Sequence, residues 1–472
     1  MNGTRIFTQI ASVLRHSPGK QDTSQDRSRE RYRLAALYGS ATLLAKVVSV
    51  VTSLITVRLA IRYLGSERYG MWLTISSIVL MLGSADLGMS SGLVNLVADA
   101  VGREDTSGAR KATASAFWLL SIIAAVLSLG MAVAYPFINP ARLLNVHSAL
   151  AVREAGPALL VFFYCFALNL PLGTVRGVQT GLQKGFINSL WVIAGSVLSL
   201  VALLIAIRLH AGLPILVLGL SGPPVLALLL NGVELFGWSH RDLTPTFSNF
   251  SRASASRLFR TGMMFFLLQL SLAIGMQADN VVIAQIMGAQ SVASYAVPAR
   301  LFNMVNVVLM MLSGTLWPAY ADAFARSDVH WIRTTFRRVA ITGTGITIVL
   351  TLVLIIFGNA ILKIWIGPQI EASASLLAVF GLQCVLNAYL QPIAFLLNGI
   401  GKFREQVITS SLMAVVNLAL SILFVRHYGI IGAVLGTVIS LAVVVVIPLT
   451  LVTRHYLHTL GHNPTAIAFE TE

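Results

Sequence analysis

The chain has 472 residues, of which 56% are hydrophobic and only 11% are charged, and its formal net charge is +15. A soluble domain carries about 25% charged residues, so this composition excludes an ordinary soluble protein. Apolar runs of about 20 residues recur along the chain and match the thickness of a bilayer. Because these runs are continuous and do not alternate apolar with polar residues, they predict helices and exclude a barrel.

The first 34 residues are polar and basic and have no apolar signal core, so we expect no cleaved signal peptide. Beyond them the sequence predicts about twelve membrane spans. Their approximate ranges are 37–63, 70–97, 113–138, 156–178, 187–207, 213–236, 261–286, 294–320, 339–362, 373–397, 406–425 and 429–452. The predicted fold class is an all-α polytopic membrane protein with about 12 transmembrane helices.

A long repeat divides the chain into halves. Ala98–Asp105 and Ala321–Asp328 lie 223 residues apart and share five of their eight residues. The same offset pairs Gly65 with Gly288. Each half holds six spans, an even number, so both copies enter the membrane from the same side. The sequence therefore predicts two six-helix bundles related by a parallel pseudo-twofold repeat.

The basic residues are divided unevenly between the two sides of the membrane. The two tails and the alternate gaps hold 22 of the 33 Lys and Arg, the opposite side holds 8, and 3 lie inside spans. By the positive-inside rule the richer side is cytosolic, which places both termini there and argues against nucleic acid as a partner. The predicted parts are a cytosolic N-terminal tail at 1–36, a first six-helix bundle at 37–237, a cytosolic linker at 238–260, a second six-helix bundle at 261–453 and a cytosolic C-terminal tail at 454–472.

Five ionisable residues lie within the predicted spans: Lys46, Asp86, Arg176, Asp279 and Arg300. Such a residue at mid-bilayer costs at least about 2.5 kcal/mol, so it usually faces a wet cavity or a partner. Three of the five are basic, and a basic cavity in a low dielectric attracts anions such as phosphate. An alternative for two of them stays open, because Asp279 and Arg300 lie at similar depth and could neutralise each other.

Polar residues at helical spacing accompany these charges. Ser49 and Ser53 continue the face of Lys46, and similar stripes follow the seventh and eighth spans. The predicted lining residues on those two spans are Gln269, Gln277, Asn280, Asn303 and Asn306. The stripes predict a cleft between the two bundles, although a single Ser can equally serve helix packing.

Four stretches resemble the polysaccharide and oligosaccharide flippases of the multidrug/oligosaccharidyl-lipid/polysaccharide exporter superfamily. They are YLGSERYGMW (63–72), ADLGMSSGLVNLVADAVGREDTSGARK (85–111), MQADNVVIAQIMGAQSVASY (276–295) and LLNGIGKFRE (396–405). The resemblance implies two bundles facing each other across a cavity. It also implies movement of a polyprenyl-pyrophosphate-linked oligosaccharide to the outer leaflet of a bacterial cytoplasmic membrane, driven by a proton or sodium gradient.

On this interpretation the protein is a transporter and not an enzyme, with no cofactor beyond a coupling ion, H+ or Na+. Lys46, Arg176 and Arg300 are predicted to hold the pyrophosphate, and Asp86 or Asp279 to couple to the ion. The expected partners are the lipid-linked oligosaccharide, membrane lipids and other polysaccharide assembly proteins. Two alternatives remain: a multidrug or organic-cation antiporter of the same superfamily, and a membrane glycan polymerase or ligase.

Overall fold

The computed structural model describes the backbone of residues 24–81, 89–313, 316, 320, 323–324, 328–367, 370–400 and 404–462. Within these ranges, the side chains at 24–39, 91, 260–276, 311–313 and 460–462 lie outside the description. The described residues form helices and no strand. The prediction of an all-α fold is confirmed.

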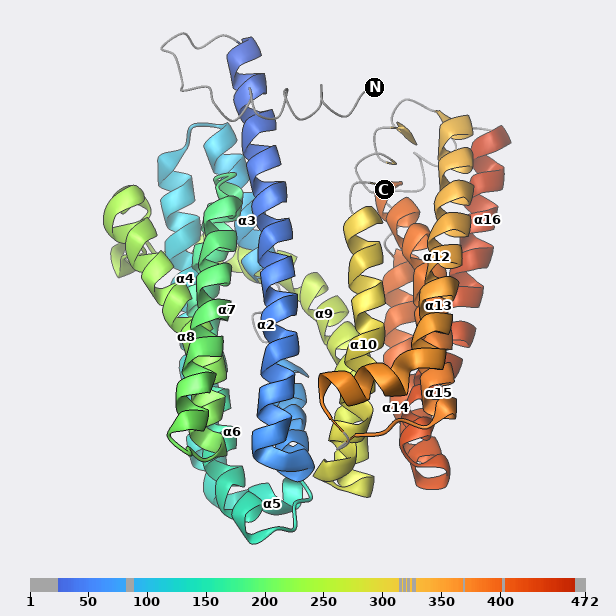
Figure 1. The fold of residues 1–472 in the computed structure, drawn as a ribbon. Helices are drawn as coiled ribbons and strands as arrows, with labels where there is room; N and C mark the ends of the chain where they lie inside the picture. Colours follow the sequence, from blue (N-terminus) through green and yellow to red (C-terminus); the bar gives the residue numbers. More distant parts are fainter. Residues whose placement is uncertain are drawn as a thin grey trace.

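Two groups of helices stand side by side, with the long helix α9 between them (Figure 1). The first group, here the N-bundle, contains α2 (Ser24–Met81), α3 (Met89–Gly102), α4 (Thr106–Ala134), α5 (Pro140–Leu143), α6 (Ala149–Gly181), α7 (Gly185–Arg208) and α8 (Leu213–Glu234). The second group, the C-bundle, contains α9 (Arg252–Met287), α10 (Ala289–Ser313), α12 (Val329–Trp365), α13 (Ala374–Gly399), α14 (Arg404–Tyr428), α15 (Ile430–Ser440), η6 (Leu441–Val446) and α16 (Ile447–His462). In Figure 1 the short helix α5 lies at the bottom; we call this the α5 end, and we call the top, where α12 begins and α16 ends, the opposite end.

Ten helices within the described residues are long and apolar enough to cross a membrane. The sequence predicts twelve spans, and two of them, the second and the seventh, are not counted separately among these ten. The stretch Ser40–Met81 joins the first span to the start of the second. Most of the side chains of the seventh span, in α9, lie outside the description.

The predicted repeat has a structural counterpart at the turn between paired spans. Gly65 interrupts α2 with φ 76° and ψ 173°, and Gly288 ends α9 with φ 89° and ψ 159°. A side chain is strained at such positive φ, so glycine fits both turns. Asp105 and Asp328, a second pair at the same offset, cap the N-termini of α4 and α12 by accepting a backbone N–H three residues on. The two halves are therefore built from the same local elements at equivalent positions.

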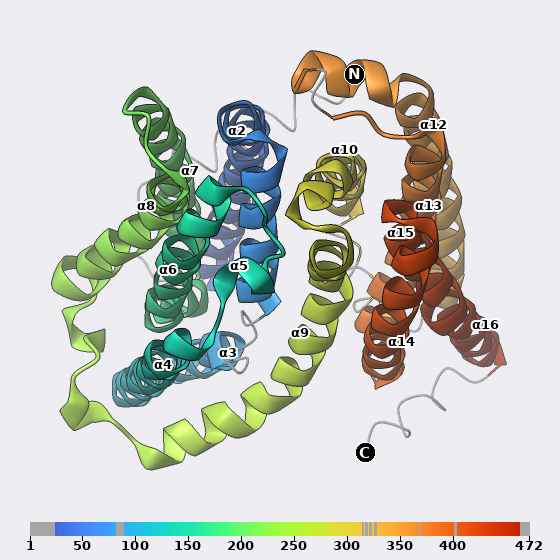
Figure 2. The same ribbon diagram turned by 90° about the horizontal axis from the view of Figure 1, so that it is seen from below.

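The segment between the bundles is attached to the N-bundle. Trp118 of α4 donates its Nε1–H to the carbonyl of Pro245 at 3.1 Å, and Ser115 of α4 exchanges two hydrogen bonds with the backbone of Ser251. Figure 2 shows α9 leaving this segment as a long helix that sweeps across to the C-bundle. A relative motion of the bundles must therefore bend or tilt α9, since the segment before it is fixed to α4.

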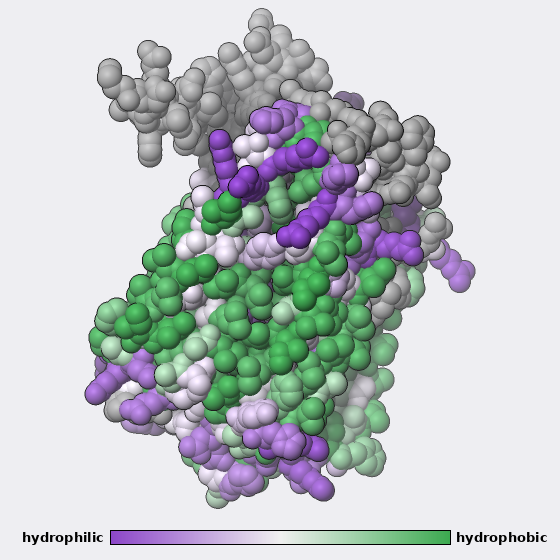
Figure 3. Space-filling view, turned by 90° about the vertical axis from the view of Figure 1, so that its right-hand side faces the viewer, coloured by the Kyte–Doolittle hydropathy of each residue, from purple (hydrophilic) through white to green (hydrophobic). Residues whose placement is uncertain are grey.

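The surface of the C-bundle has the banding of a membrane protein. Figure 3 shows hydrophobic residues in a broad middle zone and hydrophilic residues gathered toward the two ends. On α12, for example, the side chains of Ile341, Val349 and Ile356 are more than half exposed. Large apolar side chains at such exposure are stable in contact with lipid tails and not with water.

Candidate transport site between the two bundles

Arg300, near the middle of α10, reaches from the C-bundle to the N-bundle. Its guanidinium Nη1 donates to the hydroxyl of Ser53 in α2 at 3.1 Å. Arg300 is half-buried, and no acidic side chain of the described chain pairs with it. Two of the predicted polar stripes thus meet here, and the junction carries the positive charge of Arg300.

A second polar contact joins α2 to α9. Ser77 donates to the side-chain oxygen of Gln277 at 3.1 Å and accepts from the amide nitrogen of Asn280 at 2.9 Å. The side-chain oxygen of Asn280 is itself buried with no hydrogen-bond partner within the described protein, as are Tyr69 Oη and Trp72 Nε1. The rings of Tyr69 and Trp72 stack edge to face at 5.5 Å. Unmatched buried polar groups are uncommon in proteins, and here three of them lie on the two helices that face each other across the interface.

The two bundles are held together at the α5 end. Arg62 donates its Nε–H to the carbonyl of Ile366 at 3.0 Å, and Trp365 donates its indole N–H to the carbonyl of Leu54 at 3.0 Å. Asn145 donates to the carbonyls of Ala284 at 3.1 Å and Gln285 at 3.3 Å. These contacts close the interface on the side where α5 lies (Figure 1).

A glycine permits the closest backbone approach at this end. A Cβ built on Gly70 of α2 would overlap the carbonyl oxygen of Ala289, at the start of α10. The two helices therefore touch at backbone level, which any larger residue at position 70 would prevent. The closed α5 end depends on this contact as well as on the hydrogen bonds.

Other predicted pyrophosphate ligands lie farther toward the opposite end. Lys46 is on α2, two turns before Ser53, and is half-buried; it forms no hydrogen bond or ion pair with a described residue. Arg176 of α6 is exposed and donates through Nη2 to Asn169 Oδ1 at 2.7 Å. Asn303 of α10 is also exposed, one turn beyond Arg300. The structure therefore brings Arg300 and Ser53 together, and it does not bring the three basic residues into mutual contact.

Some predicted lining residues face their own bundle. The Ser49 hydroxyl lies 3.3 Å from that of Ser196 on α7, and Asn306 donates to Cys384 Sγ at 3.7 Å within the C-bundle. Contacts of this kind are typical of helix packing in a membrane. Asp86 and the side chain of Gln269 lie outside the described residues.

Asp279 lies at the centre of a buried polar cluster inside the C-bundle. Its carboxylate is 3% exposed and accepts hydrogen bonds from Tyr295 at 2.9 Å, from Ser421 at 2.8 Å and from Thr437 at 2.8 Å. The side-chain oxygen of Asn417 also lies 3.2 Å from both the Ser421 and the Thr437 hydroxyls. We call these five residues the Asp279 cluster. Both Asp279 and Arg300 are described, and no ion pair joins them; each has different partners.

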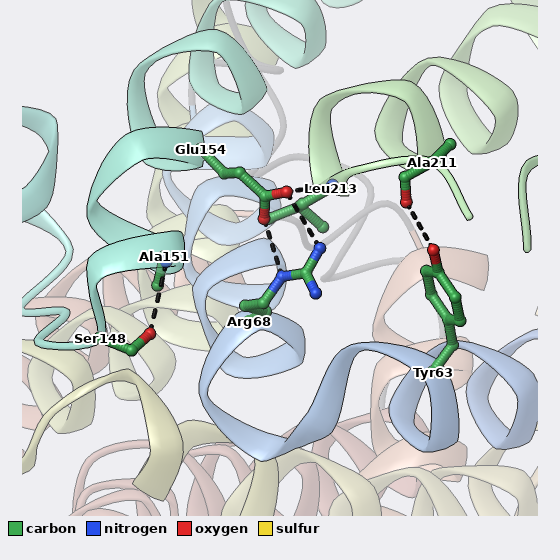
Figure 4. Close-up of polar contacts among 7 residues, drawn as sticks. All are labelled: Tyr63, Arg68, Ser148, Ala151, Glu154, Ala211 and Leu213. Carbon is green, nitrogen blue, oxygen red and sulfur yellow. Dashed lines mark hydrogen bonds and ion pairs between the residues drawn. The ribbon is translucent and has the colours of Figure 1, made fainter.

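A different arrangement surrounds the buried carboxylate of the N-bundle, Glu154 (Figure 4). Arg68 of α2 pairs with it in a bidentate manner, at 2.7 Å through Nε and 3.0 Å through Nη2. The same carboxylate accepts the backbone N–H of Leu213 at 3.1 Å, where α8 begins. Nearby, Tyr63 of α2 donates to the carbonyl of Ala211 at 2.8 Å. These contacts tie α2, α6 and α8 together at the α5 end and serve the structure of the bundle.

Sequence reasoning did not single out these partners. Arg68 and Glu154 lie beside predicted span ends, where a charge is ordinary. Ser421 and Thr437 are isolated hydroxyls in apolar runs. One signal was available: Asn417 and Ser421 are four residues apart and so share a helix face in the eleventh span. That spacing could have suggested a polar patch, but not its acidic partner in the seventh span.

Comparisons with known proteins give the family. A sequence profile described as "Polysaccharide biosynthesis protein" matches residues 38–324, and the MatE profile matches residues 260–423. A Yersinia pseudotuberculosis protein named for O-antigen export is 24% identical over 189 residues, which are 40% of this chain and 43% of that protein. The uncharacterized membrane protein EpsK of Bacillus subtilis is 21% identical over 417 residues, which are 85% of this chain and 79% of EpsK.

The fold also has solved relatives. The structure described as the inward-facing conformation of a multidrug resistance MATE family transporter of the MOP superfamily superposes with a TM-score of 0.77. The superposition covers 90% of this chain and 99% of that one, at 18% identity, and confirms the two-bundle architecture. Both matched families are families of transporters and not of enzymes. Since the first profile covers well over half of its residues, this multi-pass membrane protein belongs to the polysaccharide biosynthesis protein family and has the fold of the MOP superfamily.

Proposed function

We propose that this protein moves a polyprenyl-pyrophosphate-linked oligosaccharide from the cytosolic to the outer leaflet for surface polysaccharide synthesis. The family match and the relative named for O-antigen export support polysaccharide export. The observation that carries the lipid-pyrophosphate part is Arg300, which lies at the junction of the two bundles and has no acidic partner among the described residues. A pyrophosphate is a compact dianion or trianion, and the planar guanidinium is well suited to bind it.

The other charges agree with an anionic head group. Lys46 and Arg176 add positive charge on the side of Arg300 away from the α5 end, while Asp279 is buried within the C-bundle and does not neutralise them. Polar side chains at the interface, including Gln277, Asn280 and Asn303, would bind sugar hydroxyls. The prenyl chain would stay in the lipid while the head group crosses between the bundles.

Alternating access would follow from the contacts at the α5 end. The basic residues indicate that this end faces outward and the opposite end the cytosol, with both termini cytosolic and the protein in a bacterial cytoplasmic membrane. On this orientation the present state is closed to the outside, by Arg62, Trp365, Asn145 and the approach of Gly70 to Ala289. Transport would require these contacts to separate while the opposite end closes.

We further propose that the Asp279 cluster binds the coupling ion, H+ or Na+. The Asp279 carboxylate is surrounded by hydroxyl groups and pairs with no cationic side chain in the described part of the chain, and burying a lone charge is costly. A proton or a monovalent cation would supply that balance, and hydroxyl, amide and carboxylate oxygens are ligands for a hard cation. Asp86 remains a second candidate for this role.

The substrate site can be tested by removing the arginine at the junction. Arg300→Ala should lower translocation of a lipid-linked oligosaccharide in proteoliposomes roughly tenfold to hundredfold, because a hydrogen bond to a charged group contributes about 1.5–3 kcal/mol. Lys46→Ala should act in the same direction, and Arg300→Lys should retain part of the activity. Arg208→Ala removes an exposed charge from the end of α7 and serves as the control.

Unchanged translocation in both Arg300→Ala and Lys46→Ala, with normal insertion, would remove the proposed site. Drug resistance on overexpression, without any glycan translocation, would favour the multidrug antiporter. New glycosidic bonds formed by the purified protein would favour a polymerase or ligase.

A further inference from the structure

A basic pocket lies on the first turns of α12, away from the interface between the bundles. Its volume is about 490 Å³, and the described residues that line it are Arg333, Thr334, Arg337, Arg338, Ile341 and Thr342. These positions recur at steps of three and four, so they form one broad face of the helix. Three of the six are arginines, and no acidic residue is among them.

The three arginines differ in their partners. Arg333 is held in place, since its Nε and Nη2 both donate to the backbone carbonyl of Leu457 on α16, at 3.1 and 2.5 Å. Arg337 and Arg338 are exposed and form no hydrogen bond or ion pair with any residue that the structure describes. The pocket therefore presents two unengaged guanidinium groups beside a third that is anchored to the neighbouring helix.

Several basic residues at the same end of the molecule are engaged, whereas others, such as Arg252 and Arg257, are exposed and have no partner among the described residues. Arg103 pairs with Asp99 at 2.9 Å, Arg110 donates to the carbonyl of Asp242, and Lys184 Nζ lies 3.0 Å from His240 Nε2. A general excess of cytosolic charge would account for any basic residue here. It does not account for three arginines that line one pocket with no acidic residue among the lining residues.

The pocket lies at the level where α12 enters the apolar zone. Ile341, at its edge, is 61% exposed, and Val349 and Ile356 continue the exposed apolar face for about four further turns. Figure 3 shows the hydrophilic end of this bundle directly above the hydrophobic zone. A ligand in this place has its head group beside arginines and its hydrocarbon against isoleucine and valine.

We propose that this pocket binds the phosphate of an anionic phospholipid. Arg337 and Arg338 hold the phosphate oxygens, with the Thr334 hydroxyl as a further donor, and one acyl chain lies along the exposed face of α12. Basic pockets beside membrane spans on the cytosolic side recognise anionic head groups by this chemistry. The site does not depend on the transported substrate, because its described lining residues all lie on α12 and not between the bundles.

The test measures the binding of a fluorescent phosphatidylglycerol to the full-length protein in neutral detergent micelles. Two basic contacts with an anionic lipid contribute about fivefold each, so Arg337→Gln with Arg338→Gln should weaken binding roughly thirtyfold. The matched control is Arg252→Gln with Arg257→Gln, which removes two exposed charges at the start of α9; it should weaken binding by less than about threefold. Fluorescent phosphatidylcholine should bind equally weakly to all variants.

Equal loss in the two double variants would show a nonspecific charge effect and overturn the proposal, as would no loss in either. Inorganic phosphate serves as a competitor. Displacement of the lipid by phosphate at micromolar concentrations would identify a site for free phosphate and contradict a lipid site, whereas persistence of the bound lipid supports it.

Discussion

Glu154 in the N-bundle and Asp279 in the C-bundle are both buried carboxylates, and they are stabilised in different ways. Glu154 in the N-bundle is 8% exposed and has a bidentate arginine as its counter-charge. Asp279 in the C-bundle is 3% exposed, and its hydrogen-bond donors among the described residues are three hydroxyl groups. The counter-charge of Glu154 is part of the protein and is always present, which suits a structural role. An unpaired charge needs a mobile counter-charge, which suits a coupling role.

The largest expected effect comes from removing the counter-charge of Glu154. Arg68→Ala leaves that carboxylate buried and unpaired, which typically costs about 3–5 kcal/mol, so the protein should lose most of its thermal stability in detergent. The control is Arg103→Ala, which breaks an exposed pair with Asp99 whose contribution is about 0.2–0.5 kcal/mol. The double variant Arg68→Met with Glu154→Leu should recover much of the loss. If Arg68→Ala melts at the same temperature as the wild-type protein, Arg68 does not stabilise the Glu154 carboxylate. The proposed contrast between Glu154 and Asp279 would then be wrong.

The next effect separates folding from transport at Asp279. Asp279→Asn keeps the size of the side chain and an oxygen acceptor. The free energy of unfolding should therefore change by no more than about 1 kcal/mol. Transport driven by an ion gradient should nevertheless be lost, because the amide cannot take up a proton or balance a cation. Gradient-driven translocation in proteoliposomes, measured beside a melting curve, gives both readings. A variant that transports normally would assign Asp279 a structural role like that of Glu154.

The smallest expected effect tests whether the hydroxyl groups stabilise the Asp279 carboxylate when no ion is bound. Tyr295→Phe removes one donor to the Asp279 carboxylate and so makes its bare, unbound form less favourable. The driving-ion concentration for half-maximal transport should therefore fall about tenfold, since a hydrogen bond to a charged group contributes about 1.5 kcal/mol or more. Tyr63→Phe is the matched control, because it deletes a tyrosine hydrogen bond to Ala211 in the N-bundle and should leave the ion dependence unchanged. An equal shift in both variants would mean that the change is not local to the cluster.

The candidate site shows where prediction from sequence ends. Ser49 and Ser53 lie on one predicted stripe, yet Ser53 accepts from Arg300 across the interface while Ser49 contacts Ser196 of its own bundle. Periodicity identifies a helix face, but that face is wide enough to touch more than one neighbouring helix. Which neighbour each residue meets depends on how the helices pack.

The alternatives left open for Asp279 were decided in the same way. Its depth matched that of Arg300, so mutual neutralisation was a reasonable hypothesis. In the structure the Asp279 carboxylate accepts hydrogen bonds from Ser421 and Thr437, which lie 142 and 158 residues farther along the chain. Contacts over such distances have no local sequence signal, because single hydroxyls in apolar runs are common in membrane helices.

The sequence by itself determined the membrane fold, its apolar spans and its internal repeat. These follow from local physics: a span must satisfy its backbone hydrogen bonds within lipid, and positive φ at Gly65 and Gly288 favours glycine wherever the rest of the chain lies. Tertiary structure alone decided which of the two buried carboxylates pairs with an arginine and which is surrounded by hydroxyl groups. Three contacts join helices that are distant in sequence: Arg68 with Glu154, Arg300 with Ser53, and the Asp279 cluster. Their geometry exists only once the helices have packed.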